Sequence, residues 1–158
     1  MKTYTEGEAL NKAAAYCTLC ERCVSEVIKK LETWGMTPAQ QHSITERLKS
    51  EMFIDETRYC RAFVNDKLKF NHWGRIKISA ALYEKQLPKE LIKEALENID
   101  EELYTQVLAD TIAAKHKELK GKDDYATRQK LMRHAASRGF EPAMIMRMIK
   151  ISDHEMDF

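Results

Sequence analysis

Turn-forming residues are scarce in this chain, which has only five glycines and three prolines in 158 residues. Folds built from β-hairpins need more of both, because tight turns depend on their backbone conformations. No clean apolar–polar alternation marks a strand, whereas apolar residues recur at helical spacing, as in Val24, Val27, Ile28 and Leu31. Charged residues make up 32% of the chain, which is typical of helices with solvated outer faces. The sequence therefore predicts an all-α protein.

Long apolar runs are also lacking. No stretch approaches the roughly 18–20 apolar residues that a membrane-spanning helix requires. The opening segment MKTYTEGEALNK has no apolar core followed by a small-residue cleavage site, so it does not resemble a secretory signal. We expect a cytoplasmic protein that makes no contact with a membrane.

The motifs of catalysis and cofactor binding are missing as well. The five histidines include no HExxH pair, and no glycine-rich phosphate loop follows a strand. No serine or cysteine lies in a recognisable nucleophile elbow. The carboxylates are spaced as surface charges of helices. We expect neither enzymatic activity, nor a cofactor, nor a small-molecule substrate.

Three of the four cysteines, Cys17, Cys20 and Cys23, follow one another at intervals of three in AYCTLCERCVSEV. A ferredoxin-type cluster needs a fourth thiolate, and Val27 occupies its position. Cys60 could complete a zinc site from elsewhere, but zinc ligands usually come from turns rather than from consecutive turns of a helix. Free cysteine is common as a small apolar residue in reducing compartments. We interpret the cysteines as helix-packing residues and predict no metal site.

Glycine and proline, where they do occur, indicate helix boundaries. Gly35 is placed to end one helix, and Thr37 can cap the next, with Pro38 in its first turn. Gly139 and Pro142 nearly repeat this junction. Other residues of the types that cap or stop helices are Asp55, Asp100 and Asp123 as caps and Gly121 as a stop.

This likeness between junctions extends to an internal repeat. CVSEVIKKLETWGMTP from Cys23 aligns with GRIKISAALYEKQLPK from Gly74 and with TRQKLMRHAASRGFEP from Thr127, at offsets of about 51 and 53 residues. The apolar positions that a helix and the turn after it would bury then coincide in three sets: Val27, Ile78 and Leu131; Leu31, Leu82 and Ala135; Met36, Leu87 and Phe140.

The repeat predicts tandem three-helix units at residues 1–53, 54–100 and 101–151, followed by an acidic tail at 152–158. The first unit opens with a short helix near Gly7 to Leu19. A unit of about 50 residues buries little surface alone, so neighbouring units should stack. We expect an elongated, curved rod, and such rods commonly bind a partner along one face.

The net charge of +1 conceals a strong segregation of charge along the chain. Between residues 58 and 77 six bases accompany the single acid Asp66, and between residues 115 and 150 ten bases accompany four acids. The segment 90–110 is acidic. Such a chain can offer a basic surface to a polyanion or an acidic partner, although solvated helix faces would give the same pattern.

The stretch FIDETRYCRAFVNDKLKFNHWGRIKISAALYEKQL, residues 53–87, resembles the central signature of the RecX family, whose members regulate the RecA recombinase. The residues that match this signature are Asp55, Glu56, Arg58, Tyr59, Phe63, Val64, Trp73, Gly74, Arg75, Ile76 and Leu82. The closing segment RQKLMRHAASRGFEPAMIMRMIK is similar to the family's last unit, with an Arg-Gly-Phe element at residues 138–140. The openings ALNKAAAYC and ERCVSEVIKKL resemble the family's first helices. One departure is Gln86, where the family often has glycine.

The resemblance implies a three-helix-repeat regulator that binds RecA or the RecA–single-stranded DNA filament. It would inhibit recombinase, ATPase and strand-exchange activity by occupying the filament groove or by blocking filament extension. Its setting would be homologous recombination, DNA repair and the SOS response. The alternative is a helical-repeat protein that binds single- or double-stranded DNA directly through the same basic segments.

Helical spacing suggests where the contact face lies. A polar stripe beside the apolar residues Tyr59, Phe63 and Phe70 consists of Arg58, Arg61, Asn65 and Lys69. The full set of candidate residues for binding a partner or DNA is Arg58, Arg61, Asn65, Lys67, Lys69, Arg75, Lys77, Arg128, Lys130 and Arg133. We expect Trp73 to pack in the core.

Overall fold

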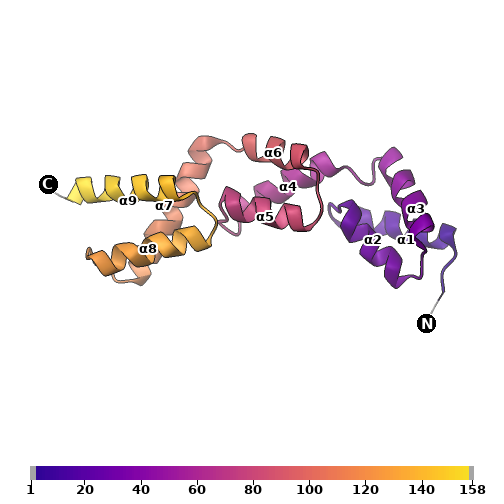
Figure 1. Ribbon diagram of the computed structural model, residues 1–158, viewed down its shortest axis with the longest axis horizontal. Coiled ribbons are helices and arrows are strands. Elements are labelled where there is room, and N and C mark those ends of the chain that lie inside the picture. The colour runs from indigo at the N-terminus through magenta and orange to yellow at the C-terminus, as the bar shows by residue number, and fades with distance from the viewer. Residues whose placement is uncertain (1–2, 157–158) are drawn as a thin grey trace. The chain divides into compact units, whose positions relative to one another are not determined.

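The computed structural model describes residues 3–156, and for residues 151–156 it describes the backbone alone. Every regular element in this range is an α-helix, so the predicted all-α class is confirmed. Figure 1 labels the helices, which are α1 (Glu6–Leu19), α2 (Val24–Thr33), α3 (Pro38–Ser50), α4 (Glu56–Lys69), α5 (Arg75–Glu84), α6 (Lys89–Glu97), α7 (Glu101–Glu118), α8 (Tyr125–Ser137) and α9 (Pro142–Met156).

The chain divides into two compact units. Unit 1 comprises Met1–Ala62 and Leu82–Lys93, and unit 2 comprises Phe63–Ala81 and Glu94–Phe158. Because the boundary crosses α4 and α5, the predicted middle unit, 54–100, contributes to both. The residue limits of three separate units, and the curved rod, stay predictions. In the predicted tail, 152–158, α9 continues to Met156, and the side chains and the last two residues lie outside the described part.

The first predicted helix junction is confirmed. Gly35 follows α2 with a φ of 79°, a conformation that glycine adopts without a steric cost. The Thr37 hydroxyl accepts a hydrogen bond from the Gln40 amide at 3.3 Å, and the Gln40 side chain accepts one from the Thr37 amide at 2.9 Å. This capping box, with Pro38 in the first turn, begins α3. Gly121 likewise lies just beyond the end of α7.

The predicted aspartate caps are confirmed at two of three helices. The Asp55 carboxylate accepts from the Arg58 amide at 3.0 Å at the start of α4, and the Asp100 carboxylate accepts from the Glu102 amide at 3.1 Å at the start of α7. The prediction of Asp123 as the third cap was wrong. Asp124 caps α8, because it directly precedes the first helical residue and its carboxylate reaches the Thr127 amide at 2.7 Å.

The positions that the repeat alignment marks as core are buried without exception. None has an exposed fraction above 6%. Complete burial of a large aliphatic side chain contributes about 1.5–3 kcal/mol to the free energy of folding. These positions are Val27, Ile78 and Leu131 in the first set, Leu31, Leu82 and Ala135 in the second, and Met36, Leu87 and Phe140 in the third.

Unit 1 has a core to which its first three helices contribute (Figure 1). The helix α1 presents the fully buried Ala9 and Ala13, whose small side chains let a neighbouring helix approach closely. Each of α1, α2 and α3 packs against the other two. The larger buried residues that complete this core are Val27, Leu31, Met36, Ile44, Leu48 and Ile54.

The cysteine segment does not form one continuous helix. Cys17 lies in α1, Cys20 directly follows α1, and Cys23 directly precedes α2. Cys23 is buried, Cys17 is half-buried and Cys20 is exposed. The prediction that all three pack as helix residues was therefore wrong for Cys20, because the chain turns at 20–23 and points this position outward. The fourth cysteine, Cys60, is buried.

Burial also governs the chemistry of these thiols. It raises the pKa of Cys17 and of Cys23, which favours the protonated form over the thiolate that binds metals. Within the part of the chain that the structure describes, no group of three His, Cys, Asp or Glu side chains is placed to hold a metal ion.

Gln86 adopts the backbone conformation of the glycines that it replaces in the repeat. Its φ is 64°, beside 79° at Gly35 and 93° at Gly139. The Leu87 amide then bonds back to the Leu82 carbonyl at 3.2 Å, as the Met36 amide bonds to the Leu31 carbonyl at 3.0 Å. The helix thus ends in the same way in all three places. Only at position 86 does the residue have a side chain, which makes the left-handed backbone conformation unfavourable.

A half-buried glutamate of α2 links the start of α2 to the end of α5 in unit 1. The Glu26 side chain accepts a hydrogen bond from the Cys23 amide at 3.1 Å and forms an ion pair with Lys85 at 3.2 Å. Burial by itself would raise the pKa of Glu26, but the Cys23 hydrogen bond and the Lys85 charge outweigh it, and the pKa is lowered. At the same place the Glu56 carboxylate of α4 accepts from the Val24 amide at 3.2 Å.

Replacing Gln86 by glycine should stabilise the protein. A non-glycine residue at positive φ costs about 1–2 kcal/mol, and glycine avoids this cost. Glycine also increases the conformational entropy of the unfolded chain, which offsets part of the gain. We therefore expect Gln86→Gly to raise the free energy of unfolding by roughly 0.5–1 kcal/mol. Urea denaturation followed by circular dichroism measures the change. Glu84→Gly, in the last turn of the same helix, serves as the control and should be destabilising. A loss of stability in both variants would contradict the strain at Gln86.

The stability of the fold should depend on the ionisation of Glu26. Its pKa in the folded protein lies below its ordinary value of 4.5, so the ionised carboxylate stabilises the fold above that pH, and the contribution disappears as the pH falls through the lowered pKa. We expect Glu26→Gln to lower the melting temperature at pH 7 and to have a much smaller effect at pH 3. Melting curves recorded across this range test it. An equal fall in melting temperature at both pH values would show that the charge of Glu26 does not contribute and that only its packing and hydrogen bonds do.

Candidate partner-binding surface

The predicted basic residues of unit 1 lie on the first two turns of α4. Arg58 and Arg61 are both exposed. The Arg58 guanidinium forms an ion pair with Glu21 and donates a hydrogen bond to the Met52 carbonyl at 3.2 Å. Hydrogen bonding to Glu21 is the main reason that the pKa of Arg58 is raised. Arg58 therefore fixes the loop before α4 in addition to any role in binding.

In unit 2, the remainder of α4 carries Asn65 and Lys69 as exposed residues and Lys67 as a half-buried one. The predicted apolar stripe is partly wrong here. Phe70 is 79% exposed because it follows the last helical residue and points away from the core. The buried face of this part of α4 is instead formed by Val64 and by Leu68, four residues later.

Two lysines lie over the indole of Trp73. The Lys67 ammonium is 4.8 Å from the ring centroid, and the Lys77 ammonium is 4.6 Å from it. Both distances are those of cation–π contacts. Trp73 is half-buried, so the expectation of a core position was wrong. It lies in the turn between α4 and α5, and the two ammonium groups lie over its ring. Lys67, Trp73 and Lys77 are called the Lys–Trp–Lys cluster below.

Backbone bonds hold the turn that carries this cluster. The Trp73 amide donates to the Lys67 carbonyl at 3.0 Å. The next residue, Gly74, donates to the Arg138 carbonyl at 2.7 Å, and the Ile76 amide donates to the Gly139 carbonyl at 3.0 Å. A side chain at Gly74 would collide with the backbone of Gly139, so only glycine permits this approach. The α8–α9 turn thereby fixes the start of α5.

Arg75 makes intramolecular contacts that stabilise the fold, although the sequence analysis placed it among the candidate binding residues. Its guanidinium forms an ion pair with Glu141 at 3.1 Å and another with Glu101. It also lies 3.9 Å from the ring centroid of Tyr104. The Tyr104 hydroxyl accepts from the Arg75 amide at 3.0 Å and donates to Glu141, and burial raises the pKa of Tyr104. Only 20% of the Arg75 side chain is exposed.

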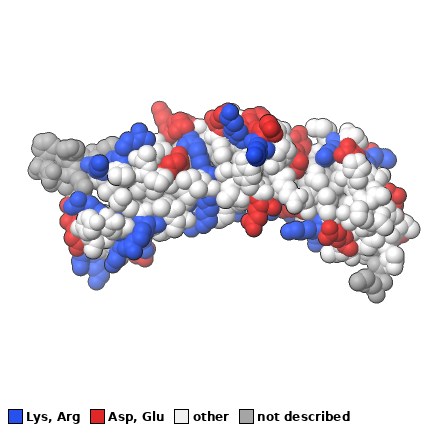
Figure 2. Space-filling view, viewed as in Figure 1, with Lys and Arg blue, Asp and Glu red and all other residues white. Residues whose placement is uncertain are grey.

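The third group of predicted residues lies on α8. Arg128 is half-buried and pairs with Asp123 at 3.5 Å, while Lys130 and Arg133 are exposed. Figure 2 shows Lys and Arg atoms gathered around the turn between α7 and α8. The structure therefore leaves the charges of Lys130 and Arg133 directed toward solvent, where a partner can reach them.

The sequence contains a second internal similarity, which would have identified one structural residue that the repeat alignment missed. IDETRY at residues 54–59 and IDEELY at residues 99–104 begin α4 and α7 in the same way. The aspartate of each caps its helix, and the tyrosine of each is buried. Tyr59 hydrogen-bonds to Glu26, as Tyr104 does to Glu141. This pair of hexapeptides would have marked Tyr104 as a structural residue.

Two stretches of the chain match models of a known protein family, in the order in which the helices occur. A family model described as the second three-helix domain of RecX matches residues 55–96, and one described as the third three-helix domain matches residues 102–149. The regulatory protein RecX of Chlorobium phaeobacteroides is 30% identical over 121 residues, which are 77% of this chain and 78% of that protein. The chain belongs to the RecX family. Its tandem three-helix repeat character is thereby confirmed.

Other RecX proteins extend the comparison. The regulatory protein RecX of Clostridium beijerinckii is 32% identical over 127 residues, 79% of this chain and 59% of that protein. The chain spans only 39% of the Lactobacillus johnsonii relative. The crystal structure of RecX from Lactobacillus salivarius has the same fold, with a TM-score of 0.84 at 18% identity over 94% of this chain and 96% of that chain. None of the helices within residues 3–156 of this RecX family member is long and apolar enough to cross a membrane.

Alanine substitutions at Arg75 and Lys77 should lower the stability of this RecX family member by different amounts. We expect Arg75→Ala to lower the free energy of unfolding by about 2 kcal/mol, because it leaves charged hydrogen-bond partners unpaired. Lys77→Ala should cost below about 1 kcal/mol, the scale of one cation–π contact. Urea denaturation of both variants measures the difference. Equal losses would contradict the structural assignment of Arg75.

Proposed function

We propose that this RecX family member is a regulatory protein that binds the RecA recombinase, or the RecA filament on single-stranded DNA, and inhibits its ATPase and strand-exchange activities. The observation that carries the proposal is the family membership, with relatives that are named regulatory proteins. The same relatives favour a binding protein over an enzyme. Its place of action would be the cytoplasm, where recombination and DNA repair occur.

The Lys–Trp–Lys cluster supports a contact with an acidic or phosphate-rich surface. Two ammonium groups within 4.8 Å of one indole centroid offer positive charge beside a flat apolar surface. Acidic side chains and phosphates bind to such ammonium groups. The exposed Lys69 continues the basic surface along α4, and Lys130 and Arg133 supply a second basic surface on α8.

The proposed mechanism is steric. Tandem three-helix units can contact successive recombinase subunits at once, and each further contact benefits from the effective concentration that the first one creates. A protein bound in this way to the filament groove or to a growing filament end obstructs subunit addition and strand exchange. No chemical step by the regulator is required.

A second candidate function is direct binding to DNA, and the Lys–Trp–Lys cluster favours it as well. Its two ammonium groups can contact phosphates, which supply much of the affinity of proteins for DNA. Such binding would weaken steeply with salt, because each phosphate contact releases counterions.

Titration of this protein into a RecA ATPase assay tests the proposal. We expect inhibition of single-stranded-DNA-dependent ATP hydrolysis, at fixed DNA and moderate salt. The double variant Lys67→Glu with Lys77→Glu should raise the inhibitory concentration roughly tenfold, because it reverses the charge at the proposed contact.

The matched control is Lys29→Glu with Lys49→Glu, which makes the same change in net charge at exposed lysines of α2 and α3 in unit 1. We expect this control to inhibit as the unchanged protein does. An equal loss in both double variants would remove the Lys–Trp–Lys cluster from the contact. No inhibition, together with salt-sensitive binding to naked single-stranded DNA, would replace the proposal by the second candidate.

A further inference from the structure

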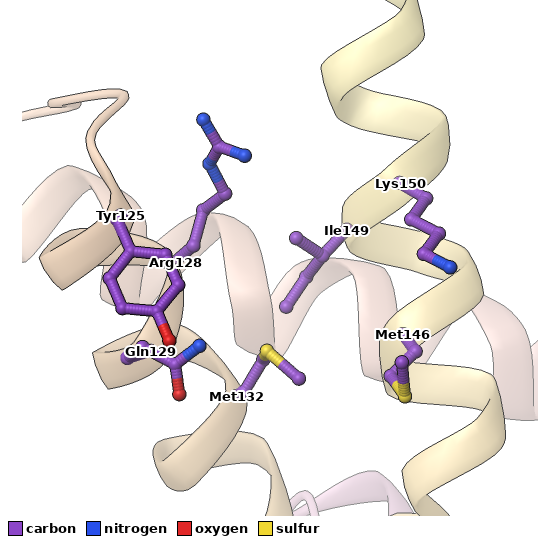
Figure 3. Close-up of a pocket in the computed structure, with 7 residues that line it drawn as sticks. All are labelled: Tyr125, Arg128, Gln129, Met132, Met146, Ile149 and Lys150. Carbon is purple, nitrogen blue, oxygen red and sulfur yellow. The ribbon is translucent and has the colours of Figure 1, made fainter.

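A groove runs along the surface where α8 and α9 pack against each other in unit 2. Its volume is about 230 Å³. Figure 3 shows Met132 of α8 and Ile149 of α9 pointing toward each other across it, with Tyr125 and Met146 at its edges. The groove is separate from the Lys–Trp–Lys cluster, whose residues do not line it.

The edges of the groove leave large apolar side chains uncovered. Tyr125 is 75% exposed and Met146 is 44% exposed, whereas Ile149 beneath them is 7% exposed. Exposed apolar side chains that flank a hollow, rather than being scattered singly, are typical of interaction sites. Two methionines among the lining residues suit a surface that adapts to its ligand, because their unbranched side chains rearrange easily.

Positive charge accompanies the apolar lining. Arg128 lines the groove from α8 and Lys150 lines it from α9 (Figure 3). Among the residues whose side chains the structure describes, none that lines the groove is acidic. The segment 115–150, which contains α8 and most of α9, carries ten bases and four acids. A ligand that complements this groove is therefore both apolar and negatively charged.

The size of the groove narrows the choice of ligand. Sites for small molecules usually have volumes of about 300–1,000 Å³ and enclose most of the ligand. A hollow of about 230 Å³ is smaller, and it accommodates one large apolar side chain. A short peptide that inserts one such side chain, with acidic residues on either side, satisfies both the apolar lining and the two basic residues.

We infer that the α8–α9 groove binds an acidic peptide segment of a protein partner, anchored by one aromatic or aliphatic side chain. The inference rests on the proposed function only in that the partner is a protein. The groove holds the anchor between Met132, Met146 and Ile149, and Lys150 pairs with a flanking carboxylate. Arg128, which also pairs with Asp123 at 3.5 Å, adds positive charge beside the groove. The contact adds a second attachment point to the one at the Lys–Trp–Lys cluster.

Fluorescence anisotropy with synthetic peptides on the full chain tests this inference without any recombinase. The probe is a short labelled peptide with one phenylalanine between aspartates and glutamates. Two comparison peptides replace the phenylalanine by alanine, or the acids by asparagine and glutamine. We expect the probe to bind and each comparison peptide to bind at least about tenfold more weakly.

Matched variants locate the site. We expect Met146→Glu and Lys150→Glu each to weaken probe binding about tenfold. Ile76→Glu and Arg147→Glu introduce the same changes at an exposed aliphatic and an exposed basic residue that do not line the groove, and they should bind as the unchanged protein does. Circular dichroism of all four variants verifies that the helices are retained.

Several results would overturn the inference. Equal binding of the phenylalanine and alanine peptides, or equal weakening by Lys150→Glu and Arg147→Glu, would reduce the effect to general attraction between opposite charges. Sedimentation that shows a dimer abolished by Met146→Glu would assign the groove to a second copy of this chain. Failure of the peptide to bind leaves the ATPase result unaffected, so the two proposals fail separately.

Discussion

The backbone contact between Gly74 and the α8–α9 turn is the constraint on which unit 2 depends. Two amides at the start of α5 donate to the carbonyls of Arg138 and Gly139, at 2.7 and 3.0 Å. Glycine is needed on both sides, since a side chain at Gly74 would meet the Gly139 backbone and one at Gly139 would meet Lys77. This approach brings Arg75 to Glu141 and fixes the start of α5, directly after Trp73.

Unit 1 solves the equivalent problem with side chains instead of close backbones. Cys23, which aligns with Gly74, is buried before α2. Its amide donates to the Glu26 carboxylate, whereas the Gly74 amide donates to a carbonyl. Glu26 then pairs with Lys85. Carboxylates thus do in unit 1 what carbonyls do in unit 2. The consequence is that unit 1 depends on ionisation in a way that the backbone contact of unit 2 does not.

Basic residues in this protein serve two purposes, and a count of charges does not separate them. Arg58 and Arg75 are held by carboxylates, and each fixes the region at the start of a helix. Lys67 and Lys77 lie over an indole instead, with their ammonium groups 4.8 and 4.6 Å from its centroid. The guanidinium is suited to the first role because its planar fork bonds several acceptors at once. The ammonium is a point charge on a flexible stem, which suits the second.

The sequence by itself determined the all-α class, the helix ends at Gly35 and Thr37, and the nine aligned core positions, because these follow from local backbone preferences and from helical periodicity. It also indicated the family. It did not decide which basic side chains are available for binding. Nor did it show that Phe70 is exposed, that Cys20 lies in a turn, or that Asp124 rather than Asp123 caps α8. The roles of Arg75 and Trp73, and the groove between α8 and α9, were decided by tertiary structure alone. The role of Arg75 depends on residues 26 and 66 positions away, and the groove depends on facing helices, so no local pattern records which groups meet. The place of Trp73 depends on how the chain turns between α4 and α5, which brings Lys67 and Lys77 over its ring.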